Sequence, residues 1–342
     1  MDTHTAIDPQ PPASVSTVSK ENVARFQISS LGRAGWQMIN SFLPYLLLWV
    51  AMVFALGVSY WLMLPLAILA AGFLIRIFII FHDCGHVSFL KSKRANNAVG
   101  VIAGLLNLTP YRHWRWQHAV HHGTAGDLDR RGSGDIWTLT VQEYLQGTRW
   151  KRFAYRLARN PLVLFVIAPL YIFVVHNRFA ASGAPKRERR SVRNTNWALL
   201  AITVAMSAAI GFKALLMIQL TVSAFAGAAG LWLFYVQHQF AGAYWAHSEQ
   251  WSYTDAALQG SSFYKLPRIL QWFTGNIGFH HIHHLSPRIP NYHLQQCHEA
   301  DPFFKTIKPV TLLGSLKSLT FRLWDEQRQA FVGFPRLEQL SR

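Results

Sequence analysis

Three short stretches of this 342-residue chain are crowded with histidine. They read HDCGH from His82 to His86, HAVHH from His118 to His122, and HHIHH from His280 to His284. Neutral imidazole binds zinc, copper, iron and nickel, so the clusters indicate a metal site, although histidine alone does not select the metal. Without a metal, burying so many rings would leave many donors and acceptors in need of partners.

The spacing inside each cluster places the rings on one face of a helix. At about 100° per residue, positions i, i+3 and i+4 fall within an arc of roughly 100°. His281 lies at the edge of this pattern and is a candidate partner of a ligand. Eight histidines fit it as ligands: His82, His86, His118, His121, His122, His280, His283 and His284. One ion with six positions cannot use all eight, so the pattern predicts two metal ions.

The residues around the clusters narrow the chemistry. A structural zinc site closes with four ligands, usually including cysteine, and the zincin pattern H-E-x-x-H is absent. Metal-activated hydrolases usually mix carboxylates with histidine. Here the clusters contain only Asp83, whose place beside His82 suits it to accept a ring N–H. An all-nitrogen site for two metals fits iron and dioxygen best.

Other residues are weaker candidates. His238 directly follows an apolar segment, where an ionisable group is a functional suspect, and His247 comes nine residues later. Asn276 lies four residues before His280, so it is expected either to orient a ligand or metal-bound water from the same helical face, or to cap a helix. The single histidines are expected to be surface or core residues: His113, His176, His293 and His298.

The composition predicts a membrane protein. The chain is 51% hydrophobic and 14% charged, with a net charge of +17. Such charge is compatible with nucleic acid, anionic lipid or an acidic protein partner. The positive-inside rule explains it best, and no nucleic acid is expected. Two cysteines, Cys84 and Cys297, suggest neither a disulfide framework nor a thiolate zinc site, and they suit a reducing compartment.

Four apolar segments of suitable length predict an all-α membrane fold. They are residues 36–56, 60–81, 197–212 and 214–235. Short turns at "GVS" and at Lys213 join them in two hairpins. The prediction is four transmembrane helices with a helical cytoplasmic cap that carries the dimetal site. Residues 1–35 are expected to form a flexible cytoplasmic tail, and residues 36–342 a single domain.

Two further apolar segments are expected to be interfacial or re-entrant. Residues 161–175 are short for a span and contain Pro169. If they crossed the membrane, the basic stretch 178–193 would lie outside, against the positive-inside tendency. The weaker segment 99–108 is interpreted in the same way. Both termini and all three histidine clusters then face the cytoplasm.

The three clusters, arranged around two membrane hairpins, resemble the histidine boxes of the membrane fatty acid desaturases. The stretch SSFYKLPRILQWFTGNIGFHHIHHLSPRIPNY, residues 261–292, is similar to the bacterial acyl-lipid Δ12 or omega-6 branch. The resemblance covers the chain from about residue 36. It implies a bacterial inner-membrane enzyme with two iron ions, which uses O2 and two electrons to form a cis double bond in a long acyl chain, carried by a membrane lipid.

One stretch departs from that family. Members of this branch often carry an acidic pair after the glutamine-histidine that ends the fourth span, whereas QHQFAGAYW has Ala241 and Gly242 there. A carboxylate partner for the site is therefore not expected at this point. The eight cluster histidines match the family boxes and are unaffected.

The electrons must come from a separate donor such as a ferredoxin. No haem or flavin segment and no G-x-G-x-x-G loop is evident. An acidic carrier would be drawn to the basic cap. Five basic residues are candidate contacts: Arg112, Arg115, Arg130, Arg131 and Lys151.

Two alternatives remain open. A related membrane diiron hydroxylase or ketolase, acting on alkanes, sterols or carotenoids, would have nearly the same box spacing. A metal transporter would place polar ligands near the middle of its spans, which are almost free of histidine and acid here. For an acyl substrate, an apolar tunnel is expected, with aromatics such as Trp114 and Trp272 as walls or as interface anchors.

Overall fold

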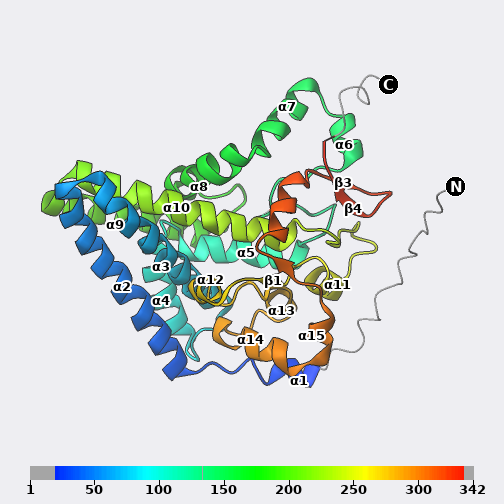
Figure 1. Cartoon of the computed structure of the whole chain (residues 1–342), viewed down its shortest axis with the longest axis horizontal. Helices are drawn as coiled ribbons and strands as arrows, with labels where there is room; N and C mark the ends of the chain where they lie inside the picture. Colours follow the sequence, from blue (N-terminus) through cyan, green and yellow to red (C-terminus); the bar gives the residue numbers. More distant parts are fainter. Residues whose placement is uncertain (1–19, 133, 335–342) are drawn as a thin grey trace.

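The computed structural model describes residues 20–132 and 134–334 and is helical for most of its length (Figure 1). The α-helices are α1 Lys20–Ala24, α2 Leu31–Val58, α3 Tyr60–His86, α4 Lys93–Leu106, α5 Tyr111–Thr124, α6 Val141–Leu145, α7 Arg149–Ala158, α8 Ala168–Leu170, α9 Lys186–Ile210, α10 Phe212–His238, α11 Tyr253–Leu258, α12 Arg268–Phe273, α13 His280–Leu285, α14 Asn291–Ala300 and α15 Pro302–Thr306. The π-helical turns η2 Val163–Ile167 and η3 Tyr171–Val175 flank α8, and the 3-10 turns are η4 His176–Arg178 and η5 Gly314–Thr320.

Two small sheets correct the all-α prediction. Strand β1 Tyr264–Lys265 pairs in parallel with β2 Val310–Thr311, and β3 Leu323–Asp325 pairs antiparallel with β4 Ala330–Val332. Strands of two or three residues are too short to show an alternating pattern in the sequence. Both sheets pair segments of the later part of the chain with one another, and they do not change the mainly helical class.

Three helices are long and apolar enough to cross a membrane: α2, α3 and α10, with mean hydropathies of 2.1, 2.5 and 1.8. They correspond to three of the predicted spans. Ser59 alone separates α2 from α3, because its N–H bonds the carbonyl of Ala55 at 2.8 Å while its hydroxyl accepts from the amide of Trp61 at 3.2 Å. The two helices pack against each other, at the point where the sequence predicts a tight turn.

The helix that contains the predicted third span begins before that segment. Helix α9 starts at Lys186 and therefore includes a basic first half, which keeps it outside the set of three apolar helices. It packs against α10, and the break between them falls at Gly211, not at Lys213. Gly211 has φ 84°, a left-handed value that glycine adopts without strain.

The segment around Pro169 forms a bent helical pair with α7. Helix α7 and residues 163–178 meet at 61° and are apolar enough for one broken span or a re-entrant loop. Proline removes one backbone N–H, which accounts for the π-helical turns on either side of α8. The segment predicted at 99–108 lies mostly in α4, which at 14 residues is too short to span.

Part of the predicted flexible tail is ordered. Residues 20–35 contain α1 and the start of α2, and Val23 is buried against the α13 and α14 region. The Ser30 amide donates to the Tyr292 hydroxyl at 2.9 Å. A prediction from composition missed these contacts because their partners lie more than 250 residues away. Residues 1–19 of the predicted tail lie outside the described residues.

Helix α3 connects two buried cores. Ile77, Ile80 and Phe81 pack with α2, α4, α5 and α10, whereas Ile79 packs with a second core around Ile282 of α13. Figure 1 shows α2 to α4 at the lower left, α13 to α15 at the lower centre, and α10 and α5 running across above them. The carboxyl end of α3 is therefore held between both cores, and that end carries the first histidine cluster.

Candidate metal centre

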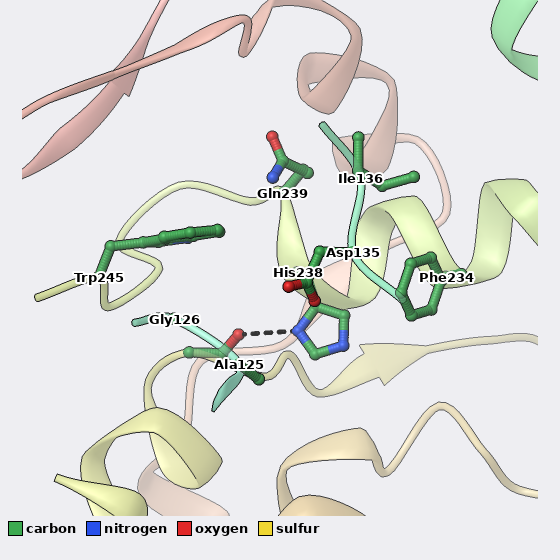
Figure 2. A pocket seen from close by; sticks show the side chains of 9 residues that line it. Ala125, Gly126, Asp135, Ile136, Phe234, His238, Gln239 and Trp245 are labelled. Carbon is green, nitrogen blue, oxygen red and sulfur yellow. Dashed lines mark hydrogen bonds between the residues drawn. The ribbon is translucent and has the colours of Figure 1, made fainter. Parts of the chain in front are cut away.

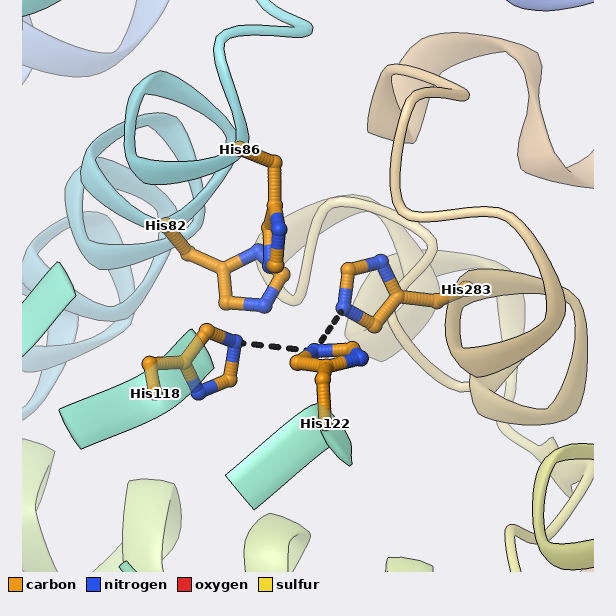
Figure 3. Close-up of side chains that lie close together, drawn as sticks. All are labelled: His82, His86, His118, His122 and His283. Atoms are coloured by element: carbon orange, nitrogen blue, oxygen red, sulfur yellow. Dashed lines mark hydrogen bonds between the residues drawn. The ribbon is translucent and has the colours of Figure 1, made fainter. Parts of the chain in front are cut away.

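Nine histidines from four helices meet at the ends of α3 and α10. The first histidine group has ligand atoms within 4.8 Å of one another and comprises His82, His86, His118, His122 and His283 (Figure 3). The second histidine group contains His121, His238 and His284, also within 4.8 Å, and we include His280, whose Nε2 lies 3.1 Å from that of His238. All eight predicted ligands and the weaker candidate His238 therefore come together.

Helix geometry explains why there are two groups. Adjacent residues on a helix point about 100° apart, so His121 and His122 of α5 enter different groups. His283 and His284 of α13 divide in the same way. The rings of His122 and His284 stack with centroids 4.1 Å apart, so the two groups share a boundary.

Burial keeps five of these imidazoles neutral. It lowers the pKa well below the ordinary histidine value, and neighbouring imidazoles lower the pKa further, for His118, His122, His280, His283 and His284. A neutral ring keeps a lone pair on one nitrogen, which is the form that binds a metal.

The donor atoms fit metal ions. Nε2 of His122 lies 3.1 Å from the Nε2 atoms of both His118 and His283. Two nitrogens at right angles on an ion, each at about 2.1 Å, would be about 3.0 Å apart. In the described part of the chain, Nε2 of His86 and of His284 are buried without a hydrogen-bond partner. Bound ions would satisfy these atoms.

Oxygen atoms behind three of the rings contact the other nitrogen, Nδ1. Asp83 Oδ1 lies 3.1 Å from Nδ1 of His82, as predicted. Asp135 Oδ1 lies 2.6 Å from Nδ1 of His121, and the carbonyl of Gly260 lies 3.3 Å from Nδ1 of His238 (Figure 2). An acceptor at Nδ1 leaves Nε2 free to face the group. A backbone carbonyl therefore makes the Nδ1 contact of His238.

Asp135 was missed by the sequence reasoning. It lies 14 residues after His121, beyond the glycines of GSGD, so no helical periodicity connects the two residues. The available signal was an acid in a glycine-rich loop close behind a histidine cluster. That signal does not show which ring the loop approaches.

The helical argument for Asn276 is wrong. Helix α12 ends at Phe273 and α13 begins at His280, and Asn276 lies between them with φ 60°. Its side chain donates to the carbonyl of Asn291 at 3.1 Å. Asn291 in turn donates to Asp83 through its amide at 2.6 Å and its side chain at 2.8 Å. Asn276 therefore contacts the site indirectly, through Asn291 and Asp83, and its carbonyl also accepts from the amide of Phe279 at 3.1 Å, directly before α13.

The other histidines lie outside both groups. His247 is exposed and contacts Asp129 and Glu326 at 2.9 Å each. His281 is buried on the opposite face of α13, against Phe304. In the described part of the chain, neither group contains any of the four single histidines: His113, His176, His293 and His298.

Aromatic side chains close the site at two points. Trp114 stacks on His118 with ring centroids 4.3 Å apart, and Phe234 lies 5.3 Å from His121. Trp272 is partly exposed and carries Arg76 over its ring, so it is the surface aromatic of the two that were predicted. A cavity of about 10 Å³ adjoins His238 and Asp135 (Figure 2), which is space for about one water.

Long apolar helices with two adjoining histidine groups at one end define a membrane protein with a candidate centre for two metals. Residues 59–309 match the family model described as fatty acid desaturase. The chain is 48% identical to a fatty acid desaturase of Bacillus subtilis (strain 168), over 89% of this chain and 86% of the relative. It therefore belongs to the fatty acid desaturase family and is an oxidoreductase, as the histidine boxes indicated.

More distant relatives carry more specific names. An sn-1 oleoyl-lipid 12-desaturase of Synechocystis sp. is 29% identical over 71% of this chain and 70% of the relative. A chloroplastic sn-2 acyl-lipid omega-3 desaturase (ferredoxin) of Arabidopsis thaliana is 29% identical over 75% of this chain and 60% of the relative. These relatives share the family but differ among themselves in the named position of the double bond.

Proposed function

We propose that this desaturase holds two iron ions and uses O2 to form a cis double bond in a long acyl chain of a membrane lipid, in the Δ12 or omega-6 position. The observation that carries the proposal is the pair of adjoining nitrogen-only histidine groups at the end of apolar helices. The name of the Synechocystis relative supports lipid-linked Δ12 chemistry, while the omega-3 names of other relatives make the position the least constrained part.

The two groups would hold one ion each. The first group offers five nitrogens and the second offers four. With dioxygen and two electrons, the irons would supply the oxidising power that an unactivated methylene C–H bond requires. O2 would leave as two molecules of water, which contain the two hydrogens removed from the acyl chain and two protons. Neutral imidazoles fill the ligand positions without adding negative charge.

The protein's own contribution is orientation and exclusion of water. Asp83 and Asp135 accept the Nδ1 protons of His82 and His121, so the ligand nitrogens of these rings point inward. Trp114 and Phe234 cover His118 and His121 with apolar surface. The acyl chain, which already lies in the bilayer, would approach along such aromatic surface.

A four-span topology fits the contacts of α9. The Arg112 amide donates to the hydroxyl of Ser191 at 3.2 Å, and the Ala181 amide donates to Nε2 of His113 at 3.0 Å. The basic residues 178–193 thus lie against the start of α5, whose other end carries site histidines. At 14 residues, α5 is about 21 Å long, shorter than a bilayer core. These contacts support α9 as the third of four spans, the bent pair as re-entrant, and termini and site on the cytoplasmic side of a bacterial inner membrane.

The electron donor is proposed to be an acidic carrier such as a ferredoxin, as in the name of the Arabidopsis relative. Two of the five predicted contacts already have acidic partners. Arg130 pairs with Asp127, and Arg131 pairs with Glu143. The remaining three, Arg112, Arg115 and Lys151, are therefore the better candidates for attracting an acidic protein.

Expression in a host that lacks polyunsaturated fatty acids tests the reaction. Gas chromatography with mass spectrometry of the host lipids should show new double bonds, and derivatisation would locate them. His280→Ala is the control and should abolish the product. New hydroxyl or keto groups in place of double bonds would instead identify the related oxygenase chemistry.

A further inference from the structure

A basic groove lies away from the histidine groups, where η4 meets α9. It is open to the surface, with a volume of about 530 Å³, within the range of ligand-binding sites. Its charged lining is Arg178, Arg189 and Arg193, and its apolar lining includes Trp197 and Leu200. The groove therefore offers positive charge at one end and apolar surface at the other.

Helical spacing produces this arrangement. On α9, Arg189, Arg193 and Trp197 follow one another at intervals of four residues and so share a face. Glu188, the neighbouring acid, points about 100° away from Arg189. Its carboxylate interacts electrostatically with His113. No acidic side chain is among the described residues that line the groove.

Arg178 is fixed, whereas the other two arginines are available. The Arg178 guanidinium donates to the side-chain oxygen of Asn196 at 3.0 Å and also to the carbonyl of Leu108, and the Asn196 side chain donates back to the Arg178 carbonyl at 2.8 Å. Arg189 and Arg193 are exposed, and their guanidinium groups have no hydrogen bond or ion pair to the described residues. Two free guanidinium groups beside a fixed one suit a phosphate, which arginine binds through paired N–H groups.

The boundary between the basic and apolar parts of α9 indicates the depth in the membrane at which such a phosphate would lie. The helix is basic from Lys186 to Arg193 and apolar from Trp197 to Ile210. A tryptophan at such a boundary is typical of the interface between headgroups and acyl chains, and basic clusters beside an apolar helix attract anionic lipids. Trp197 and Leu200 are exposed on the apolar side.

We propose that this groove binds the phosphodiester headgroup of an anionic phospholipid, with the first part of an acyl chain lying along Trp197 and Leu200. The headgroup phosphate accepts hydrogen bonds from Arg189 and Arg193, while Arg178 provides a fixed positive charge. The site is separate from the histidine groups, so the proposal does not depend on the desaturation reaction.

Tryptophan quenching tests the proposal on the full chain. The protein is reconstituted in phosphatidylcholine vesicles that contain a minority of either phosphatidylglycerol or phosphatidylcholine brominated on the acyl chains. The Trp197→Phe variant isolates the signal of Trp197. Brominated phosphatidylglycerol should quench this signal more than brominated phosphatidylcholine at equal fraction.

The decisive comparison uses two double variants of equal charge. Arg189→Gln with Arg193→Gln should lower the relative affinity for phosphatidylglycerol roughly 30-fold, as expected for two basic groups near an anionic headgroup. Arg187→Gln with Arg190→Gln, on the same helix but outside the groove lining, should keep the preference. Thermal melting establishes that both variants fold.

Three results would overturn the proposal. Equal losses in both double variants would mean diffuse attraction of anionic lipid and no site. Loss of the preference on adding inorganic phosphate would mean a site for free anions. If the groove variant kept its preference for phosphatidylglycerol but slowed electron transfer from an acidic donor, the groove would instead be a protein-docking surface.

Discussion

At the scale of single residues, the proton on each imidazole decides which nitrogen can bind a metal. His82 and His121 each have a carboxylate at Nδ1, and His238 has a backbone carbonyl. These acceptors favour the ring form with its lone pair on Nε2. Removing one of these acceptors should therefore weaken metal binding although no ligand is changed.

The Asp135→Asn variant should weaken metal binding in the second histidine group. The amide keeps nearly the same shape but removes the charge that lies 2.6 Å from the Nδ1 atom of His121. Loss of such a partner typically costs about 10- to 100-fold in metal affinity or activity. The measurement is iron per chain after dialysis against a graded series of chelator concentrations, together with turnover.

Glu249→Gln is the matched control, because Glu249 is an exposed acid away from the site. It should bind iron as the unmodified chain does. If Asp135→Asn retained iron to the same chelator concentration as the control, Asp135 would have no part in holding the site.

Substitution of His281 should stabilise the protein, whereas substitution of the neighbouring His280 should remove iron. Both ring nitrogens of His281 are buried without a hydrogen bond to the described residues, and the ring lies among Phe263, His298 and Phe304. His281→Leu removes these polar atoms at similar volume, so the free energy of unfolding should rise by about 1 kcal/mol. His280→Leu should lose iron and activity. Melting curves and iron content of the two variants check this, and loss of iron in His281→Leu would make His281 part of the site.

The sequence could identify residues whose spacing is helical, but not residues brought in by loops. All eight cluster histidines were predicted because helical periodicity places them on common faces. The contact of Asp83 with His82 followed from adjacency. Asp135 and Gly260 were not predictable, because loop conformation determines where they lie. Asn276 was assigned to a helix that begins four residues after it.

At the scale of elements, the packing of α8 against α10 depends on one glycine. A Cβ atom added at Gly227 would lie 2.6 Å from Cβ of Pro169, whereas one added at Gly230 would meet nothing within 4 Å. Gly227→Ala should therefore lower the free energy of unfolding by about 1–3 kcal/mol through overpacking. Gly230→Ala should be neutral or slightly stabilising, since alanine favours helix. Thermal unfolding in detergent compares the two; equal melting temperatures would show that α8 does not pack on α10 there.

His247 joins two elements in a way that depends on pH. Its hydrogen bond to Asp129 and then that to Glu326 raise the pKa of His247 above its ordinary value. Asp129 precedes α6, and Glu326 lies in the turn between β3 and β4. A raised folded-state pKa means that the stabilisation is complete below the unfolded-state pKa of about 6.5 and is lost as the pH rises through the raised value.

His247→Gln, which cannot be protonated, tests this link. The melting temperature of the unmodified chain should exceed that of the variant at a pH of about 6, and the difference should shrink as the pH rises to about 9. A difference that stayed constant over this range would mean that the charge of His247 does not hold the two elements together.

The predictions of elements succeeded where hydrophobicity alone determines them. Helices α2, α3 and α10 were located from apolar length. Helix α9 extends beyond the predicted span because its first half is basic, and hydropathy locates only apolar segments. The two short sheets and α1 depend on contacts between distant parts of the chain, which a single sequence does not reveal.

At the scale of the whole molecule, the site requires that distant segments share one side of the membrane. Half of the most apolar part of α3 is buried, and this helix ends in the first histidine group. Helix α10 ends at His238. The ends of these two apolar helices therefore lie at the same depth relative to the proposed membrane. Helices α5 and α13 bring the other histidines to that level, so the proposed topology can be tested with a few external labels.

Cysteine labelling tests the proposed four-span topology. Both native cysteines, Cys84 and Cys297, are buried, so the unmodified chain should label weakly. A membrane-impermeant maleimide on intact cells should label Val58→Cys and Lys213→Cys, because both lie at hairpin ends opposite the histidine groups. It should label Ser182→Cys and Lys265→Cys only after the membrane is opened. External labelling of Ser182→Cys would make the bent pair a full span, and the basic groove would then lie outside the cell.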